Sequence, residues 1–305
     1  MFCKTSLMFM KKFLFNLIAF FAIVLFFSCK TEKGATPAYI HIKKFTFTSI
    51  AATQGLATFE IRSAKLFVNS QEIGNFELPA SVPVLAEGLC KIEIFPNIRE
   101  TGSSNYNLYY LPYTYYNADL TLKKLRIDTV SPSCTYRSNA KFEWIEDFEN
   151  QTITLNPSGQ NNSSDSFKII PMNTPGVDAP FSGSNYCAYL NMTKDSSAIF
   201  EVSSLKTFYL PNMGRDIYLE MDIKTNDFFQ TGILTDNGFQ IIKTPIFLIY
   251  PTNGNWKKLY INLKSETGNM PTGTSIKLLF GLVKSKTQLE NPQIYIDNLK
   301  LVYLN

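Results

Sequence analysis

The sequence alternates most regularly between polar and apolar residues in the stretch Leu89-Cys90-Lys91-Ile92-Glu93-Ile94-Phe95. Successive side chains of a β-strand point to opposite faces, so Lys91 and Glu93 share one face while Cys90 and its apolar neighbours share the other. Such alternation is typical of a strand with one face on a core and the other in water. The stretch therefore predicts a sheet that is covered on one side.

Similar strand-like stretches, separated by turn residues, continue in both directions along the chain. Aromatic residues make up 14% of the sequence and charged residues 18%, a composition rich in strand formers. No stretch after residue 30 keeps a helical period. We therefore predict an all-β chain, with strands at Tyr39–Phe47, Ala64–Asn69, Ile73–Leu78, Leu89–Phe95, Leu120–Lys123, Leu125–Asp128, Tyr186–Leu190, Ala198–Val202, Ile217–Ile223, Ile241–Ile249, Trp256–Leu263, Ile276–Val283 and Gln293–Tyr303.

The domain organisation follows from the position of Ser131-Pro132-Ser133, which favours a boundary between two β-rich parts. We predict a small N-terminal β-sandwich followed by a larger C-terminal jelly roll, preceded by a signal-peptide helix. The predicted segments are a signal peptide at 1–28, a tether at 29–38, the small β-sandwich at 39–130, a linker at 131–141 and the jelly roll at 142–305.

The N-terminus has the parts of a secretory signal. Residues 1–12 carry three lysines and no acid, Phe13–Phe27 is apolar except for one asparagine, and Ser28-Cys29 follows. This apolar run has 15 residues, fewer than the ~20 that a membrane-spanning helix needs. The alternative is an uncleaved transmembrane helix in which Cys29 has no role.

The run that ends in Phe26-Phe27-Ser28-Cys29 resembles the lipoprotein signals of the Bacteroidota. The resemblance implies that the Cys29 thiol is acylated, with chains such as palmitate, and that the mature protein begins there. Lys30 follows where an Asp would suggest inner-membrane retention. We therefore expect a protein of the cell envelope, lipid-anchored at the outer membrane, with the membrane as a partner.

Net charge and cysteine content limit the partners and the disulfides that the protein can have. Without the three lysines of the signal the net charge is close to +1, and no basic face is evident, so nucleic acid is not expected as a partner. The mature chain keeps Cys90, Cys134 and Cys187, so at most one disulfide can form within it.

The order of motifs between residues 64 and 96 resembles the PEGA and transthyretin-like β-sandwiches. The matching residues are Leu66–Asn69, Ile73-Gly74, Pro83, Glu87-Gly88 and Ile92–Ile94, although Ser70 stands where that family has Gly. The resemblance implies surface display rather than chemistry. Asp128-Thr129-Val130 matches the pattern at which exported Bacteroidota proteins are O-glycosylated, so Thr129 is a candidate site; an ordinary strand end is the alternative.

The C-terminal part resembles jelly-roll carbohydrate-binding and MAM-like modules. The resemblance is carried by Asp147-Phe148-Glu149, Trp256–Ile261 and Ile294–Leu301. It implies a glycan or a surface protein as the ligand, and a structural Ca²⁺ held by Glu149 and Asp297, since Ca²⁺ takes several oxygen ligands. The alternative is that Asp297 bonds to nearby backbone. No other cofactor is expected.

The sequence contains only incomplete motifs for a catalytic site. Glu220 and Asp222 share a face of one strand, as the carboxylates of some jelly-roll glycosidases do, but Thr225 stands where a further Glu is needed. A solvated strand face is the favoured interpretation. The only histidine, His41, lies in the first strand. We therefore do not expect an enzyme.

The tyrosine-rich stretch Asn105–Tyr116 supplies candidate binding residues, Tyr109, Tyr110, Tyr113 and Tyr115. They could stack on a glycan, contact a protein, or pack on their own sandwich. The predicted function is a non-catalytic, lipid-anchored envelope protein whose jelly roll binds a glycan or a surface protein. The alternatives are a glycan-active hydrolase using Glu220 or Asp222, and a structural subunit of a surface complex.

Overall fold

The structure is a computed structural model that describes residues 35–102, 107–159, 161–177, 183–192, 198–211, 214–284 and 291–305. Ala38–Asn305 form one compact unit, separate from Met1–Pro37. The predicted signal peptide, Cys29 and most of the tether lie outside the described residues. No helix within the described residues is long and apolar enough to cross a membrane.

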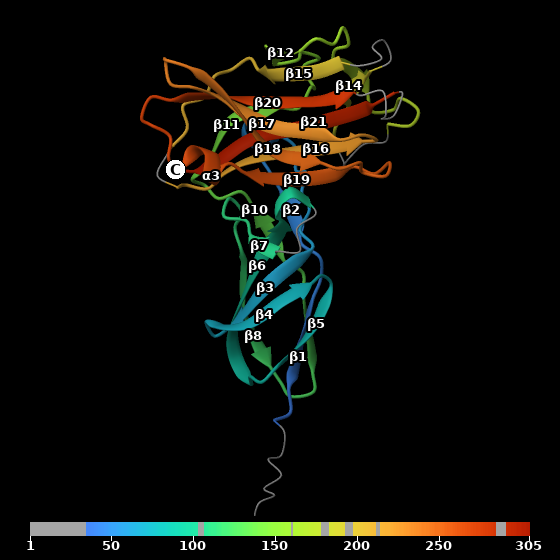
Figure 1. The fold of residues 1–305 in the computed structure, drawn as a ribbon. Helices are drawn as coiled ribbons and strands as arrows, with labels where there is room; N and C mark the ends of the chain where they lie inside the picture. The colour runs from blue at the N-terminus through green and yellow to red at the C-terminus, as the bar shows by residue number, and fades with distance from the viewer. Residues whose placement is uncertain are drawn as a thin grey trace, which may run out of the picture. The chain divides into compact units, whose positions relative to one another are not determined.

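The N-terminal region of the unit is built from two layers of strands (Figure 1). One layer contains a sheet in the order β5-β1-β9 and a parallel pair, β10 and β2. These strands are β1 (Ala38–Ile42), β2 (Thr46–Thr48), β5 (Ala80–Val84), β9 (Ile127–Val130) and β10 (Ser133–Thr135). A four-residue helix, α2 (Ala51–Gln54), follows β2.

The other layer is a sheet in the order β4-β3-β6-β7, with β8 also paired to β6. Its strands are β3 (Ser63–Val68), β4 (Gln71–Glu77), β6 (Gly88–Arg99), β7 (Asn107–Tyr109) and β8 (Tyr116–Leu122), with a 3-10 turn η1 (Glu100–Gly102) after β6. Cys90 and Ile92 of β6 are buried in one core with Ile40 and Ile42 of β1, so the alternation of β6 has the predicted inner face.

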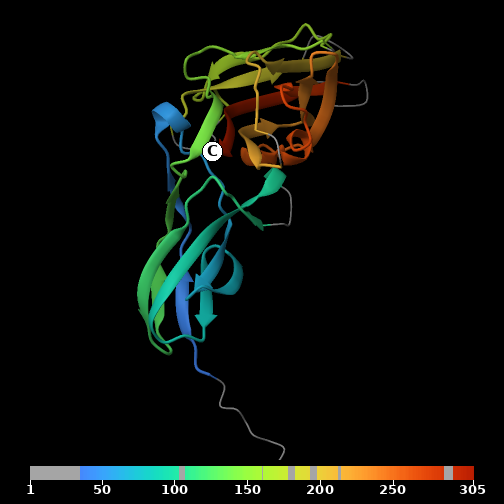
Figure 2. The same ribbon diagram turned by 90° about the vertical axis from the view of Figure 1, so that its left-hand side faces the viewer.

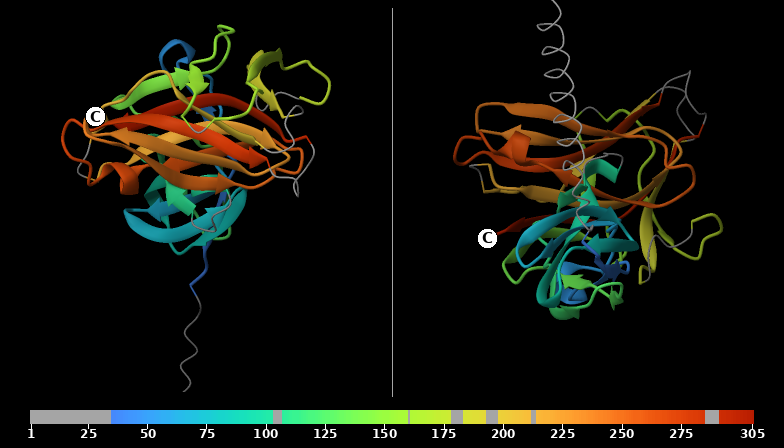
Figure 3. Two further views of the ribbon diagram at one scale, coloured as in Figure 1. Left: turned by 45° about the horizontal axis from the view of Figure 1, so that its top comes forward. Right: turned by 90° about the horizontal axis from the view of Figure 1, so that it is seen from below.

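The C-terminal region is a sandwich of two antiparallel sheets, seen as layers in Figures 2 and 3. The six-stranded sheet has the order β13-β14-β21-β16-β19, with β11 also paired to β21. Its strands are β11 (Ala140–Glu146), β13 (Lys168–Pro171), β14 (Tyr186–Asn191), β16 (Ile217–Thr225), β19 (Lys257–Asn262) and β21 (Gln293–Leu304). The predicted linker 131–141 thus contains β10 and the start of β11.

The five-stranded sheet has the order β12-β15-β20-β17-β18. Its strands are β12 (Leu155–Pro157), β15 (Ala198–Ser204), β17 (Phe229–Asp236), β18 (Ile241–Ile249) and β20 (Ser275–Lys284), and a one-turn helix α3 (Lys264–Thr267) follows β19. The predicted all-β fold with a sandwich is confirmed.

Alternating residues of both sheets fill the space between them. Met221 and Ile223 of β16 pack with Leu278 and Phe280 of β20 in the sandwich core. The outward faces differ. Tyr218 and other outward residues of the six-stranded sheet belong to the core of the N-terminal region. The outward face of the five-stranded sheet instead exposes residues such as Leu248 and Val283.

Candidate functional site

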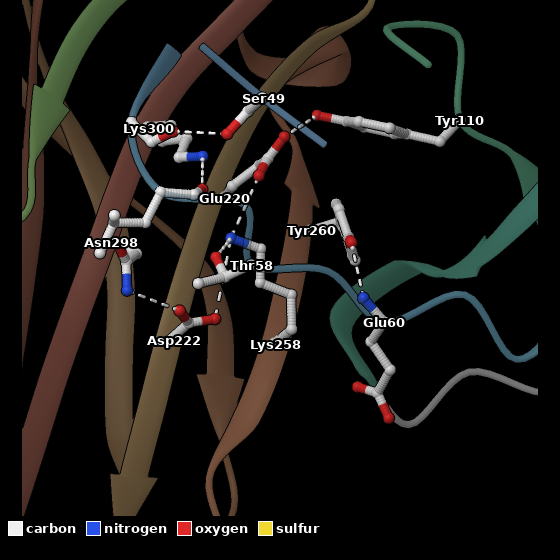
Figure 4. Close-up of polar contacts among 12 residues, drawn as sticks. Ser49, Thr58, Glu60, Tyr110, Glu220, Asp222, Lys258, Tyr260, Asn298 and Lys300 are labelled. Atoms are coloured by element: carbon white, nitrogen blue, oxygen red, sulfur yellow. Dashed lines mark hydrogen bonds and ion pairs between the residues drawn. The ribbon is translucent and has the colours of Figure 1, made fainter. Parts of the chain in front are cut away.

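Charged side chains gather on the outward face of the six-stranded sheet, where the N-terminal region covers it (Figure 4). Glu220 and Asp222 of β16, Lys258 of β19 and Lys300 of β21 are at most 1% exposed. The segment after α2 closes over them, since Lys258 Nζ donates to Thr58 Oγ1 at 3.0 Å and Lys300 Nζ to the Leu56 carbonyl at 2.7 Å.

Glu220 is the best-bonded member of this buried charged cluster. Its carboxylate accepts the Tyr110 hydroxyl at 2.6 Å and the Tyr136 hydroxyl at 2.9 Å, and Lys258 Nζ lies 3.1 Å away. Burial alone would raise the pKa of Glu220, but the charges of Lys258 and Lys300 and these hydrogen bonds lower it. Glu220 is therefore ionised, and it joins both parts of the compact unit.

The neighbouring carboxyl groups, those of Asp222 and Asp297, have raised pKa values instead. Burial raises the pKa of Asp222 to about 6, although the charge of Lys258, whose Nζ is 3.7 Å away, and a hydrogen bond of 3.0 Å from Asn298 Nδ2 both lower it. Burial and the charge of Asp222 raise the pKa of Asp297 well above its ordinary value. Asn298 Nδ2 also donates to Asp297 at 2.8 Å and so bridges the two acids.

The two lysines also differ. Burial lowers the pKa of Lys258, but Asp222 and Glu220 more than offset it and the pKa is raised. Burial lowers the pKa of Lys300 to about 8, and the positive charge of Lys258 adds to this shift, while the negative charge of Glu220 opposes it. Lys300 is therefore the weakest cation of the cluster.

This burial corrects the prediction that Glu220 and Asp222 lie on a solvated strand face. The alternation placed both on one face correctly, but the N-terminal region covers that face. A carboxylate with no exposed surface cannot reach a polysaccharide, so the hydrolase alternative loses the groups on which it rested.

The predicted tyrosine surface is corrected in part. Tyr110 and Tyr113 are fully buried against Tyr260 of β19, so neither side chain can contact a ligand. Tyr109 and Tyr115 are half-buried, and both rings pack on Phe95. These tyrosines therefore pack within the protein, as one of the predicted alternatives had it. Tyr110 and Tyr113 pack across the contact between the N-terminal region and the sandwich, and not only within their own region.

The predicted calcium ligands are engaged by N–H donors. Glu149 accepts the backbone N–H of Asn185 and Tyr186 and the Asn185 side chain, and Asp297 accepts the backbone and side-chain N–H of Asn298. Within the described residues no group of three or more His, Cys, Asp or Glu could hold a metal. Ca²⁺ takes six to eight oxygen ligands, so these contacts lend the calcium site no support and it stays a prediction.

Thr129 of β9 is exposed. Cys90, Cys134 and Cys187 are buried and free. Burial raises the pKa of the Cys134 and Cys187 thiols to about 12, so neither is a reactive thiolate.

The outward face of the five-stranded sheet carries a pocket of about 300 Å³. A row of paired residues crosses its centre, from Glu201 through Gly281 and Gln230 to Leu248. A Cβ at Gly281 would lie 2.5 Å from the Phe200 carbonyl oxygen, so only glycine fits. The floor of the pocket is therefore bare backbone between a carboxylate and an amide.

The walls of this pocket are apolar, and its polar groups are few. Ile199, Phe228, Leu248 and Val283 line it. The Glu201 side chain is nearly buried and forms an ion pair with Lys243, whose side chain is partly exposed. An apolar hollow with a small number of fixed donors and acceptors is the usual form of a small-ligand site.

Sequence reasoning missed this pocket. Gly232 and Gly281 stand inside strands, and a glycine there often marks a close backbone approach. That signal was available, whereas the pairing of Glu201 with Lys243 across 42 residues was not.

No family model and no curated protein matches this chain. Among solved structures it is similar to a family 61 carbohydrate-binding module in complex with β-1,4-galactotriose, at 16% identity over 52% of this chain and 94% of that one, TM-score 0.34. The family 11 module of the cellulase Lic26A-Cel5E of Clostridium thermocellum gives 13% identity over 52% and 94%, TM-score 0.34. A β-sandwich carbohydrate-binding module of promiscuous specificity gives 12% over 79% and 85%, TM-score 0.38. At TM-scores below 0.5 these similarities carry no argument about the ligand.

Proposed function

We propose that this chain is a non-catalytic, lipid-anchored protein of the cell envelope that binds a glycan on the five-stranded sheet. The observation that carries the ligand site is the pocket over Gly281, with its bare floor and flanking polar groups. A sugar ring has apolar faces and a rim of hydroxyls. Its faces fit Phe228 and Leu248, and its hydroxyls can bond to Gln230 and Lys243.

An exposed aromatic pair extends this site. The Phe228 and Tyr250 rings meet edge to face, 5.2 Å apart, at the end of the pocket where β17 begins and β18 ends. Aromatic rings combine a large contact area with little conformational freedom, which suits them to hold a sugar face. The pair would position a second ring of an oligosaccharide.

A glycan array with the chain from Lys30 onward tests the site. We expect Phe228→Ala and Gln230→Ala each to weaken binding of an array hit about tenfold, the loss of roughly 1.4 kcal/mol. Tyr209→Ala is the matched control, since Tyr209 is exposed but lines a different pocket. Equal binding by all three variants would contradict the site.

A surface protein is the second candidate ligand, favoured by the edge strand β18. Phe239 and Ile241 at its start are largely exposed apolar residues. If a protein partner binds there, Ile241→Lys abolishes its capture from envelope extracts and Phe228→Ala does not. Capture that survives Ile241→Lys excludes this edge.

The membrane attachment rests on the resemblance at Cys29. In a host that processes lipoproteins, Cys29→Ala should abolish labelling of the protein by a fatty-acid probe. Labelling that persists in the variant contradicts the anchor. The labelled protein is expected in the outer-membrane fraction.

Thr129 is proposed as an O-glycosylation site. Its side chain is exposed on β9, which is an edge of its sheet, so an enzyme can approach it. The intact mass of protein from its native host should fall by one glycan in Thr129→Ala. An unchanged mass contradicts the assignment.

A further inference from the structure

The end of the N-terminal region where β1 begins exposes several large apolar side chains. Leu85, Leu89, Leu125 and Ile127 are exposed by 73%, 73%, 74% and 61%. Figure 1 shows the start of β1 at the end of this region that points away from the sandwich. We call these four residues the apolar tip.

Strand register places the apolar tip around the first residues of β1. Ala38 pairs with Val84, the residue before Leu85, and Tyr39 pairs with Ile127. Gly88, just before Leu89, pairs with the last residue of β8. An ion pair of 2.9 Å between Lys124 and Glu87 joins the loops that carry Leu125 and Leu85.

Folding alone does not account for the apolar tip. Leu125 sits in the turn between β8 and β9, closed by a hydrogen bond of 3.1 Å from Arg126 N–H to the Lys123 carbonyl. Its φ is +63°, a conformation in which glycine or asparagine is favoured over leucine. The strain costs stability and the exposed side chain gains no burial energy in return, a combination that favours contact with a partner.

The chain itself indicates what the partner is. Only eight residues, nine Cα–Cα steps, separate Cys29 from Ala38, and the apolar run Phe13–Phe27 precedes Cys29. Nine steps reach at most about 30 Å when the chain is fully extended. A membrane that holds Cys29 is therefore always within that distance of β1.

The charges of the same end suit a lipid surface. Lys123, Lys124 and Arg126 are exposed beside Leu125. Lys124 pairs with Glu87, and Arg126 with Asp128. Apolar side chains with lysine and arginine at their margin are typical of segments that enter the headgroup layer of a bilayer.

We propose that the apolar tip is a membrane-contact surface, with its leucines and isoleucine in the interfacial layer of the bilayer. This inference rests on the proposed membrane attachment. The contact limits the tilt of the anchored protein and holds the pocket of the five-stranded sheet away from the bilayer.

Fluorescence quenching by brominated lipid tests the contact. The acylated full chain is reconstituted into phosphatidylethanolamine–phosphatidylglycerol vesicles with brominated acyl chains. The two native tryptophans are shared by every variant, so the signal is the added fluorescence relative to the unsubstituted chain. We expect the added signal of Leu125→Trp, and of Leu89→Trp, to be quenched at least twofold more than that of Phe239→Trp.

Phe239→Trp is the matched control because Phe239 is equally apolar and 97% exposed, but lies on the sandwich. Equal quenching at Leu125, Leu89 and Phe239 in vesicles that retain the protein contradicts the contact and leaves the anchor standing. A full chain that fails to float with the vesicles contradicts the attachment, and the contact with it.

Discussion

The two outward faces of the sandwich carry similar charged pairs, but the two pairs differ in their exposure to solvent. Each has a glutamate paired with a lysine from another strand, Glu220 with Lys258 on the six-stranded sheet and Glu201 with Lys243 on the five-stranded one. The first pair has no exposed surface, whereas 39% of the Lys243 side chain is exposed.

The comparison shows that the role of each glutamate–lysine pair depends on whether another part of the chain covers its face of the sheet, and not on the residue types alone. Under the N-terminal region the charges are enclosed with tyrosine hydroxyls and backbone carbonyls, and they hold two β-layers together. On the uncovered face a similar pair borders a bare backbone floor and remains available to a ligand.

The largest expected effect is on the buried pair. Glu220→Ala removes the acceptor of Tyr110, Tyr136 and Lys258 and leaves a buried cation without its partner, which costs about 3–5 kcal/mol of unfolding free energy. Glu201→Ala frees a partly exposed lysine and costs about 1 kcal/mol or less. Urea denaturation of both variants measures the difference, and equal losses would contradict it.

A smaller loss is expected at Gly55, where the covering segment crosses Lys300. Its φ is +69°, and a Cβ there would lie 2.9 Å from Lys300 Cε. We expect Gly55→Ala to lower the unfolding free energy by about 2 kcal/mol, from backbone strain and displacement of the buried lysine. Gly88→Ala is the control, with a φ of +85° and no atom within 4 Å; a loss as large there would exclude a packing contribution at Gly55.

The smallest predicted effect is a pH dependence from Lys300. Its pKa is about 8 in the folded chain against an ordinary 10.5, so between these values the unfolded chain holds a proton that the folded chain has released. Stability therefore rises with pH in that window, by at most about 1.4 kcal/mol per unit for one group. We expect the Lys300→Met variant to lose this rise of unfolding free energy between pH 8 and 9.5, as measured by denaturation curves at each pH. If the variant keeps the same rise, Lys300 is not its cause.

The sequence predicted which residues share a face more reliably than what covers that face. Alternation identified Cys90 and Ile92 as an inner face and placed Glu220 with Asp222, because a period of two is a local property of a strand. The burial of Glu220 depends on Tyr110 and Tyr136, 110 and 84 residues away in sequence. No local pattern encodes such a contact.

The candidate site shows the same limit. Its floor depends on Gly281, which pairs with Glu201 and Gln230 on opposite sides. Strand order within the five-stranded sheet brings these three residues together, and periodicity does not determine strand order. Cys29, Thr129 and the glycan itself stay predictions.

Hydrogen exchange with and without a bound oligosaccharide tests the contrast between the two faces most directly. The probe is the best soluble hit of the glycan array, added at saturation to the chain from Lys30 onward. We predict slower exchange at the backbone amides of β17, β18 and β20 around the pocket, with β16 and β19 unchanged under the N-terminal region. Protection confined to β16 and β19, or no binding by any glycan, would contradict the assignment of the uncovered face as the ligand site.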